Sequence, residues 1–228
     1  MKKRRVVITG LGIISPVGNN VNDSWSNIIN GVSGIALIEN INTDDQAVKI
    51  GGAIKNLDIS QYLSPKEAKK MDIFIHYGMA AGIQAFEDSG IEVTESNADR
   101  IGVAIGAGIG GLTTIEKTAD LFREKGPRRI SPFFVPSSII NMVSGNLSIK
   151  YGLKGPNFAI VTACTTGTHN IGDASRIIEY GDADIMIAGG TEMSTTNCGL
   201  GGFAAARALS TRNDDPQTAS RPWDVDRD

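Results

Sequence analysis

The sequence predicts an α/β fold with a layered, mixed but largely parallel sheet flanked by helices. The main observation is one strand, helix and strand unit: an apolar run at residues 158–163, a helical pattern at 165–180 that stops at Gly181, and a second apolar run at 185–188. Parallel strands need a crossover of this kind between them. The second observation is size, since 228 residues with 41% hydrophobic and 21% charged residues can bury one large core.

The earlier elements follow in order. The β-branched residues 6–9 predict a first strand rather than a signal peptide, because no small-residue cleavage site follows them. Residues 23–30 predict a short helix with Asp23 as its N-cap and Gly31 as its stop. Ser64 followed by Pro65 is typical of an N-cap and a first helical position.

Three further elements lead up to the strand, helix and strand unit. Apolar residues recur at helical spacing through residues 71–88, and this predicted helix ends near Gly90. The apolar run at 100–105 predicts a buried strand, and 139–149 predicts another helix.

Composition excludes several classes of protein. The formal net charge of −3 argues against a nucleic-acid-binding protein. No apolar run approaches the roughly 18 to 20 residues that span a bilayer, so we expect no membrane association. Two cysteines cannot form a disulfide framework, which favours a cytoplasmic protein, and no cysteine or histidine spacing fits a metal site.

Residues 210–228 differ from the rest of the chain. They are polar and end with an aromatic residue embedded among charges. A domain rarely ends in this way without a following element to cover the aromatic side chain. We therefore expect that the chain stops inside a fold.

Two glycine motifs follow predicted strands. Residues 106–111 satisfy the G-x-G-x-x-G pattern of dinucleotide-binding proteins, but no acidic residue follows at the end of a next strand. The motif at Gly10 lacks its third glycine, because position 15 is Ser15. We favour the interpretation that these glycines are turns where elements pack closely.

Cys164 lies between the predicted strand at 158–163 and the helix at 165–180. The first amides and the positive end of the helix dipole then point at the sulfur, which favours the thiolate and a nucleophilic role. The small neighbours allow a sharp turn, as in a nucleophile elbow, and the same amides are able to stabilise an oxyanion. The alternative is an inert, buried cysteine.

A convincing base for this thiol is missing. His169 lies about 140° around the helix from Cys164, so it is better explained as a packing or hydrogen-bonding residue. His76, on an apolar helix, is better explained as a satisfied, partly buried histidine. Cys198 has no helix start behind it and is interpreted as structural.

At this point the sequence resembles a known family. Residues 162–167, TACTTG, are similar to the active-site signature of the β-ketoacyl-[acyl-carrier-protein] synthases, the condensing enzymes of fatty acid synthesis. The resemblance runs from end to end and is closer to the type II than to the type I enzymes. Its further stretches are VITGLG at 7–12, GIGG at 108–111, SPFFVP at 131–136, YGDAD at 180–184, AGGTE at 188–192, ALS at 208–210 and SRPWD at 220–224.

The resemblance implies a thiolase-like fold, in which two similar α/β halves are stacked in layers and the enzyme is a homodimer. Residues 1–228 would be the N-terminal half. Cys164 would accept an acyl chain from acyl-carrier protein as a thioester. Condensation with malonyl-carrier protein, with loss of CO₂, would then lengthen the chain by two carbons without a cofactor.

Other residues carry over from the family one at a time. Ile109 and Phe203 resemble acyl-pocket residues, and Phe134 resembles the residue that closes the partner's pocket across the dimer; ordinary core packing is the alternative for each. The basic residues that resemble a docking rim for the acidic carrier protein are Lys66, Lys69, Lys70, Arg128, Arg129 and Arg207. The alternative for the three lysines is a solvated helix start.

One departure from the family is large. Its two catalytic histidines, its lysine and its gating phenylalanine loop belong to the second half, beyond Asp228, and neither His76 nor His169 matches them. We therefore expect that this chain alone does not condense acyl chains. A dinucleotide-binding oxidoreductase and a non-catalytic chain-length-factor-like subunit are the alternatives, and the presence of Cys164 argues against the second.

Overall fold

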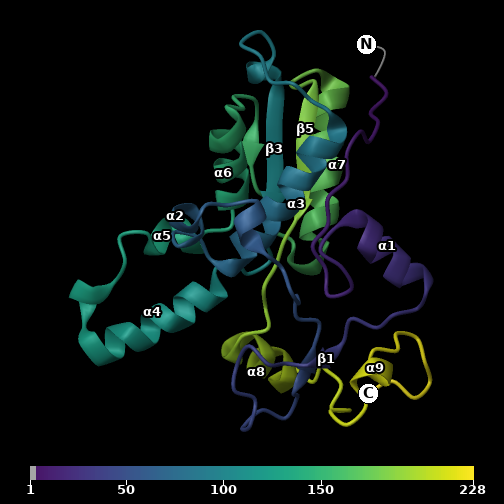
Figure 1. Ribbon diagram of the computed structural model, residues 1–228, viewed down its shortest axis with the longest axis vertical. Helices are drawn as coiled ribbons and strands as arrows, with labels where there is room; N and C mark the ends of the chain where they lie inside the picture. Colours follow the sequence, from purple (N-terminus) through teal and green to yellow (C-terminus); the bar gives the residue numbers. More distant parts are fainter. Residues whose placement is uncertain (1–3) are drawn as a thin grey trace. The chain divides into compact units, whose positions relative to one another are not determined.

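The computed structural model describes residues 4–228, which form two compact units (Figure 1). The first unit contains the segment up to Gly12 together with residues 59–193. The second contains residues 13–58 and 194–228.

Three strands form the sheet of the first unit. β3 (Ile101–Gly106) is central, with β4 (Asn157–Phe158) and β5 (Ile185–Gly190) beside it. Both pairs are parallel, and Ile101 lies opposite Ile185. Every residue of β3 is buried. The predicted strands near 100–105 and 185–188 and the parallel sheet are confirmed.

Helices cover both faces of this sheet, as Figure 1 shows. On one face, α3 (Ile73–Ser89) and α6 (Met142–Tyr151) pack against each other and against the sheet. On the other, α7 (Thr166–Tyr180) packs against β3 and β5. The largest fully buried side chains of the first unit include Phe74, Ile75, Met79, Ile101 and Leu147. The layers confirm the α/β class.

The remaining elements of the first unit are short or peripheral. They are the helices α2 (Pro65–Ala68), α4 (Leu112–Lys125) and α5 (Phe134–Ser138), and 3-10 turns at Ile59–Gln61, Ala98–Arg100, Pro127–Arg129 and Ala163–Thr165. The predicted helix at 139–149 begins later, at Met142, because Ile139 is extended.

Local sequence signals explain the helix ends. Ser64 caps α2 in a capping box, with its backbone N–H donating to Glu67 and its hydroxyl accepting from the Glu67 backbone N–H. The hydrogen bonds from Ser64 hold the pKa of Glu67 below its usual value. Gly90 ends α3 and Gly181 ends α7, both in the left-handed conformation. These predicted ends are confirmed.

An ion-pair cluster lies at the amino ends of β3 and β5. Asp184 accepts from the Arg100 guanidinium at 3.1 Å and from Arg4 at 2.5 Å. The hydrogen bonds from Arg100, and then those from Arg4, lower the pKa of Asp184 to about 2. The cluster ties Arg4, the first described residue, to the amino ends of these two strands.

The second unit has a small core of its own around Ile38, Val48, Ile50, Leu200 and Ala219. Its elements are the antiparallel pair β1 (Ala36–Leu37) and β2 (Ile50–Gly51) and the helices α1 (Val21–Ile29), α8 (Asn197–Ala205) and α9 (Pro216–Ala219). The predicted helix at 23–30 is therefore present, but its N-cap is Asn20 rather than Asp23. The Asn20 side chain accepts the hydrogen bond from the Asp23 backbone N–H.

The prediction of a strand at residues 6–9 is wrong. The segment is irregular, and the Ile8 side chain is 79% exposed. Residues 6–9 pair with no other described strand. Residues 6–11 and β5 line the same cavity, of about 380 Å³. Instead, the Leu11 backbone N–H donates to the Asp88 carboxylate of α3 at 2.9 Å.

Candidate functional site

Cys164 lies in a sharp turn directly before α7. The turn is the 3-10 segment Ala163–Thr165, and the Cys164 side chain is exposed. Ala163 has a φ of 51°, a left-handed conformation that is uncommon for a residue with a side chain. The predicted turn at the helix N-terminus is confirmed, and the exposure of Cys164 contradicts the burial that the alternative interpretation requires.

We call residues 160–166, which contain this 3-10 segment and the residues that lead into it, the cysteine turn. Side chains of α7 hold the cysteine turn in place. The buried Asn170 amide accepts from the Ile160 backbone N–H at 3.0 Å and donates to the Ile160 carbonyl at 3.1 Å. The Thr166 hydroxyl accepts from the Thr162 backbone N–H at 3.0 Å. The predicted strand at 158–163 is therefore wrong beyond Phe158, because a side-chain amide takes the backbone groups that a neighbouring strand would pair.

The cysteine turn is also held close to the sheet. Gly190, at the end of β5, faces the first turn of α7, where a Cβ on Gly190 would lie 2.8 Å from the Gly167 Cα. Only a glycine allows this approach without a shift of backbone. The N-terminus of α7 is thereby held in close contact with the end of β5.

Both histidines have local partners. His169 Nδ1 lies 2.7 Å from the Thr162 hydroxyl, so this ring braces the cysteine turn. His76 is partly buried, and its Nε2 lies 2.9 Å from the Ala68 carbonyl. Both contacts confirm that hydrogen bonding is the better explanation of these residues.

The interpretation of Cys198 was wrong in one respect. A helix does begin there, since Thr196 caps α8 by accepting from the Gly199 backbone N–H. Cys198 lies in the first turn of α8 and is exposed. Its helix belongs to the second unit, whereas Cys164 belongs to the first.

The glycine-rich segment at residues 106–111, which we call the glycine loop, leads into α4. Gly110 has a φ of 88°, and the Gly111 backbone N–H donates to the Ser138 carbonyl at 3.0 Å. The Ile109 and Gly110 amides donate to the Glu192 carboxylate at 2.8 and 3.1 Å. Protein groups thus accept from the amides that a dinucleotide phosphate would need, and close packing explains the glycines.

The three predicted acyl-pocket residues lie on different elements. Ile109 is on the glycine loop, and its side chain is 43% exposed. Phe134 is half-buried at the start of α5, whose C-terminal residue Ser138 contacts the glycine loop. The structure therefore brings the elements that carry Ile109 and Phe134 together. Phe203 is exposed on α8 of the second unit.

The six predicted docking residues are on the surface. Lys66 and Lys69 are exposed on and after α2, and Lys70 lies with its ammonium group 4.8 Å from the centre of the Phe133 ring. Arg128 and Arg129 are exposed in the turn after α4. Arg207 is exposed after α8, in the second unit. None of these six side chains forms an ion pair with another described residue.

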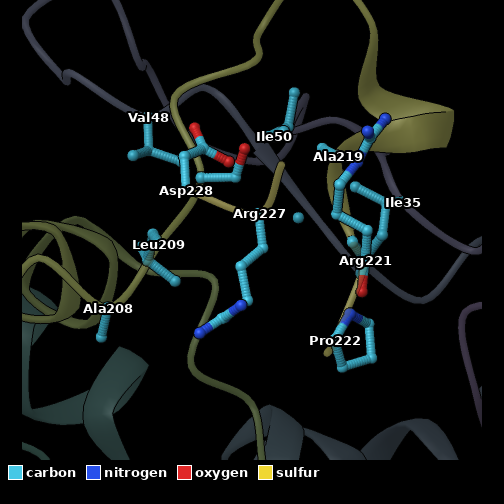
Figure 2. Close-up of a pocket in the computed structure, with 14 residues that line it drawn as sticks. Ile35, Val48, Ile50, Ala208, Leu209, Ala219, Arg221, Pro222, Arg227 and Asp228 are labelled. Carbon is cyan, nitrogen blue, oxygen red and sulfur yellow. The ribbon is translucent and has the colours of Figure 1, made fainter. Parts of the chain in front are cut away.

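A cavity of about 420 Å³ in the second unit is lined by residues in and beside β1 and β2 and by residues of the segment 208–228. Its lining includes the apolar side chains of Ile35, Val48 and Leu209. It also includes two arginines, Arg221 and Arg227. Figure 2 shows the guanidinium groups of Arg221 and Arg227 pointing in different directions. Each donates to a nearby backbone carbonyl, so they do not converge on one anion position.

Within residues 4–228 there is no cluster of three histidine, cysteine or acidic side chains that is placed to hold a metal ion. No helix formed by the same residues combines the length and the apolar character needed to cross a bilayer.

Comparison with known proteins identifies the family. Residues 3–228 match the family described as "Beta-ketoacyl synthase, N-terminal domain". The chain therefore belongs to the β-ketoacyl synthase family. The thiolase-like α/β fold implied by the resemblance is confirmed.

Several relatives are named 3-oxoacyl-[acyl-carrier-protein] synthase 2. The protein of that name from Vibrio cholerae is 62% identical over 228 residues, and that from Coxiella burnetii is 56% identical over the same length. Each alignment covers 100% of this chain and 55% of the relative. The chain thus spans about half the length of the curated relatives it matches.

Solved structures agree with this assignment. A β-ketoacyl synthase from Burkholderia phymatum has a TM-score of 0.87 at 26% identity, over 100% of this chain and 56% of that one. A ketosynthase of a type II polyketide synthase, solved in complex with its acyl-carrier protein, has a TM-score of 0.77 at 25% identity, over 92% of this chain and 58% of that one.

Sequence reasoning missed two residues of the site. Glu192 carries a signal that could have indicated it: it lies two residues after the parallel strand β5, and an acidic residue there is placed at the edge of the sheet where functional groups gather. Asn170 gives no comparable signal, because a buried amide within an amphipathic helix is ordinary until its partners are known.

Proposed function

We propose that this chain carries the acyl-accepting cysteine of a β-ketoacyl-[acyl-carrier-protein] synthase of type II, an acyltransferase of fatty acid synthesis. The Cys164 thiolate attacks the thioester carbonyl of acyl-carrier protein. A new carbon–sulfur bond forms, and the bond to the carrier's sulfur breaks. The carrier thiolate leaves and takes a proton from solvent, while the acyl chain stays on Cys164.

The observation that carries this proposal is the placement of Cys164. It is exposed, it directly precedes a helix of 15 residues, and its turn is fixed by buried polar side chains. An exposed thiol at a helix N-terminus is placed for nucleophilic chemistry. Membership of the β-ketoacyl synthase family supports the same role.

The complete enzyme would condense the acyl group with malonyl-carrier protein. Loss of CO₂ leaves a carbanion that attacks the carbonyl of the acyl thioester on Cys164. A carbon–carbon bond forms, the acyl–sulfur bond breaks to release the Cys164 thiolate, and the product is two carbons longer. The histidines and the lysine that the family uses for decarboxylation have no match in residues 1–228. The proposal therefore includes that this chain alone does not condense, and it requires no cofactor.

The proposed partners are acyl- and malonyl-loaded carrier protein and a second copy of the enzyme. The six surface basic residues suit an acidic carrier by electrostatic steering. Ile109, Phe134 and Phe203 are proposed to line the acyl site, with Phe134 reaching the partner's pocket in a homodimer. Neither Cys164 nor Cys198 forms a disulfide bond within residues 4–228, which suits a cytoplasmic enzyme.

Covalent labelling tests the nucleophile. The protein is incubated with acyl-carrier protein, and the adduct is measured by intact mass and located by peptide mapping. We expect one acyl group on the wild type and none on Cys164→Ala. The control is Cys198→Ser, which removes the other exposed cysteine and should leave acylation unchanged.

The contrary results are equally clear. An adduct on Cys164→Ala, or its loss in Cys198→Ser, would overturn the assigned nucleophile. Condensation by the purified 228-residue chain would overturn the proposal that it lacks the decarboxylating groups.

A further inference from the structure

Glu192 holds the glycine loop by two consecutive backbone amides. Its Oε2 accepts from the Ile109 N–H at 2.8 Å, and its Oε1 accepts from the Gly110 N–H at 3.1 Å. Hydrogen bonds to a carboxylate are stronger than neutral ones, and two of them from one planar group fix direction as well as distance. Glu192 therefore determines both the position and the orientation of the backbone at Ile109.

Glu192 is itself held firmly by its neighbours. The Thr191 N–H donates to the Gly106 carbonyl at 3.0 Å, and its hydroxyl donates to the Phe74 carbonyl at 2.8 Å. On the other side, Met193 is buried in the main core. The carboxylate thus extends from a backbone anchored to the sheet and to α3, which is what a fixed positioning group requires.

The same carboxylate lies beside the cysteine turn. A Cβ built on Gly108 would be 2.8 Å from Glu192 Oε2 and 3.3 Å from the Ala163 carbonyl oxygen. Glu192 and the residue before Cys164 therefore approach the same face of Gly108. The spacing between the glycine loop and the cysteine turn is set at this point.

We propose that Glu192 is a positioning residue for the acyl chain: by holding the Ile109 and Gly110 amides, it fixes Ile109 relative to Cys164 and so sets which chain lengths reach the thiol. This inference rests on the proposed acylation of Cys164 and on Ile109 as a pocket residue. Glu192 touches neither the sulfur nor the acyl chain in this role. It acts through Ile109.

A merely structural role is the competing explanation, because a carboxylate near the start of α4 also favours that helix. The chain offers a matched control for it. Asp72 is buried and accepts from the Thr114 N–H in the first turn of α4 at 2.7 Å and from the Phe74 N–H at the start of α3 at 3.2 Å, whereas the Ile109 and Gly110 amides donate to Glu192. Asp72→Asn weakens the starts of both α4 and α3 and leaves the loop amides with Glu192.

The test uses the full-length protein as it is expressed naturally. It measures the rate of Cys164 acylation with two donors, acetyl- and dodecanoyl-carrier protein. In Glu192→Gln one side-chain oxygen remains to accept from one of the two loop amides. The side-chain NH₂ group then faces the other backbone N–H, and two donors cannot form a hydrogen bond. We expect this variant to lower the dodecanoyl rate about tenfold, as a misplaced contact does, and to leave the acetyl rate within about twofold. Asp72→Asn should change both rates by the same factor.

A double mutant shows whether the effect passes through Ile109. In an Ile109→Ala background, Glu192→Gln should leave the ratio of the two rates unchanged, because the side chain that it positions is gone. Glu192→Asp keeps the charge on a shorter side chain and should give an intermediate ratio. This variant carries the test if Glu192→Gln fails to fold.

Each outcome decides the matter. Equal loss with both donors, no loss with either, or the same selectivity change in the Ile109→Ala background overturns the positioning role. Absence of acylation in the wild type with both donors instead overturns the proposed function, and the positioning role falls with it.

Discussion

The two ends of the strand pair β3 and β5 use acidic residues in opposite ways. At the amino ends, Asp184 is neutralised by two arginine side chains. At the carboxyl ends, Glu192 is bound by two backbone amides of the glycine loop. An ion pair between long side chains tolerates movement, whereas amides fix the backbone itself, and the site lies at the end where the backbone is fixed.

The two ends of the strand pair also differ in their other contacts. The carboxyl end also holds Gly190 against α7 and the buried Asn170 against the cysteine turn. At the amino end, the ion pair of Asp184 is half-exposed, with the Arg100 side chain 36% and the Asp184 side chain 49% exposed. Changes at the carboxyl end should therefore cost more stability than changes at the amino end.

The largest effect is expected for Asn170→Leu. It leaves the backbone groups of Ile160 without the amide that pairs them, and we expect the free energy of unfolding to fall by about 3 kcal/mol. Urea unfolding measures it. Thr168→Ala, an exposed change on the same helix, is the control, and a loss below about 1 kcal/mol for Asn170→Leu would remove the claim that this amide holds the turn.

The next effect tests the close approach of β5 and α7. In Gly190→Ala the new methyl group would lie 2.8 Å from the Gly167 Cα, so backbone must move, at a cost of about 2 kcal/mol. Iodoacetamide labelling of Cys164 should also slow as the turn shifts. Gly189→Ala is the control, since nothing lies within 4 Å of its Cβ position. Equal behaviour of the two variants would show that the contact is unimportant.

The smallest effect is expected at the amino end. Asp184→Asn removes the charge that Arg100 and Arg4 pair, but the pair is half-exposed, so at pH 7 the loss should stay below about 1 kcal/mol. The folded pKa of Asp184, about 2, lies below its ordinary 3.8. The stability that it contributes is therefore complete above about pH 4 and is lost as the pH falls towards 2.

Unfolding curves between pH 7 and pH 2.5 follow this loss. The difference between wild type and Asp184→Asn should shrink as the pH falls. Asp182→Asn serves as the control, because Arg100 donates to the Asp182 backbone carbonyl, which this change retains. A difference that stays constant with pH would mean that the ion pair does not stabilise the fold.

Much of the fold followed from local signals in the sequence. The capping box at Ser64, the left-handed ends at Gly90 and Gly181 and the apolar run of β3 depend on residues close together in the chain. The strand predicted at residues 6–9 failed for a non-local reason. Its apolar pattern suits a strand, but a strand also needs a partner, and residues 6–9 pair with none of the described strands.

The sequence by itself determined the α/β class, the position of Cys164 before a helix and membership of the β-ketoacyl synthase family, because periodicity, capping and motif spacing are encoded locally. Only the tertiary structure decided that Asn170 replaces a strand partner and that Glu192 holds Ile109. Those contacts join residues 10 and 83 positions apart. The packing of helices against the sheet brings such residues together. Local sequence patterns therefore do not predict which side chain forms a hydrogen bond with which backbone group.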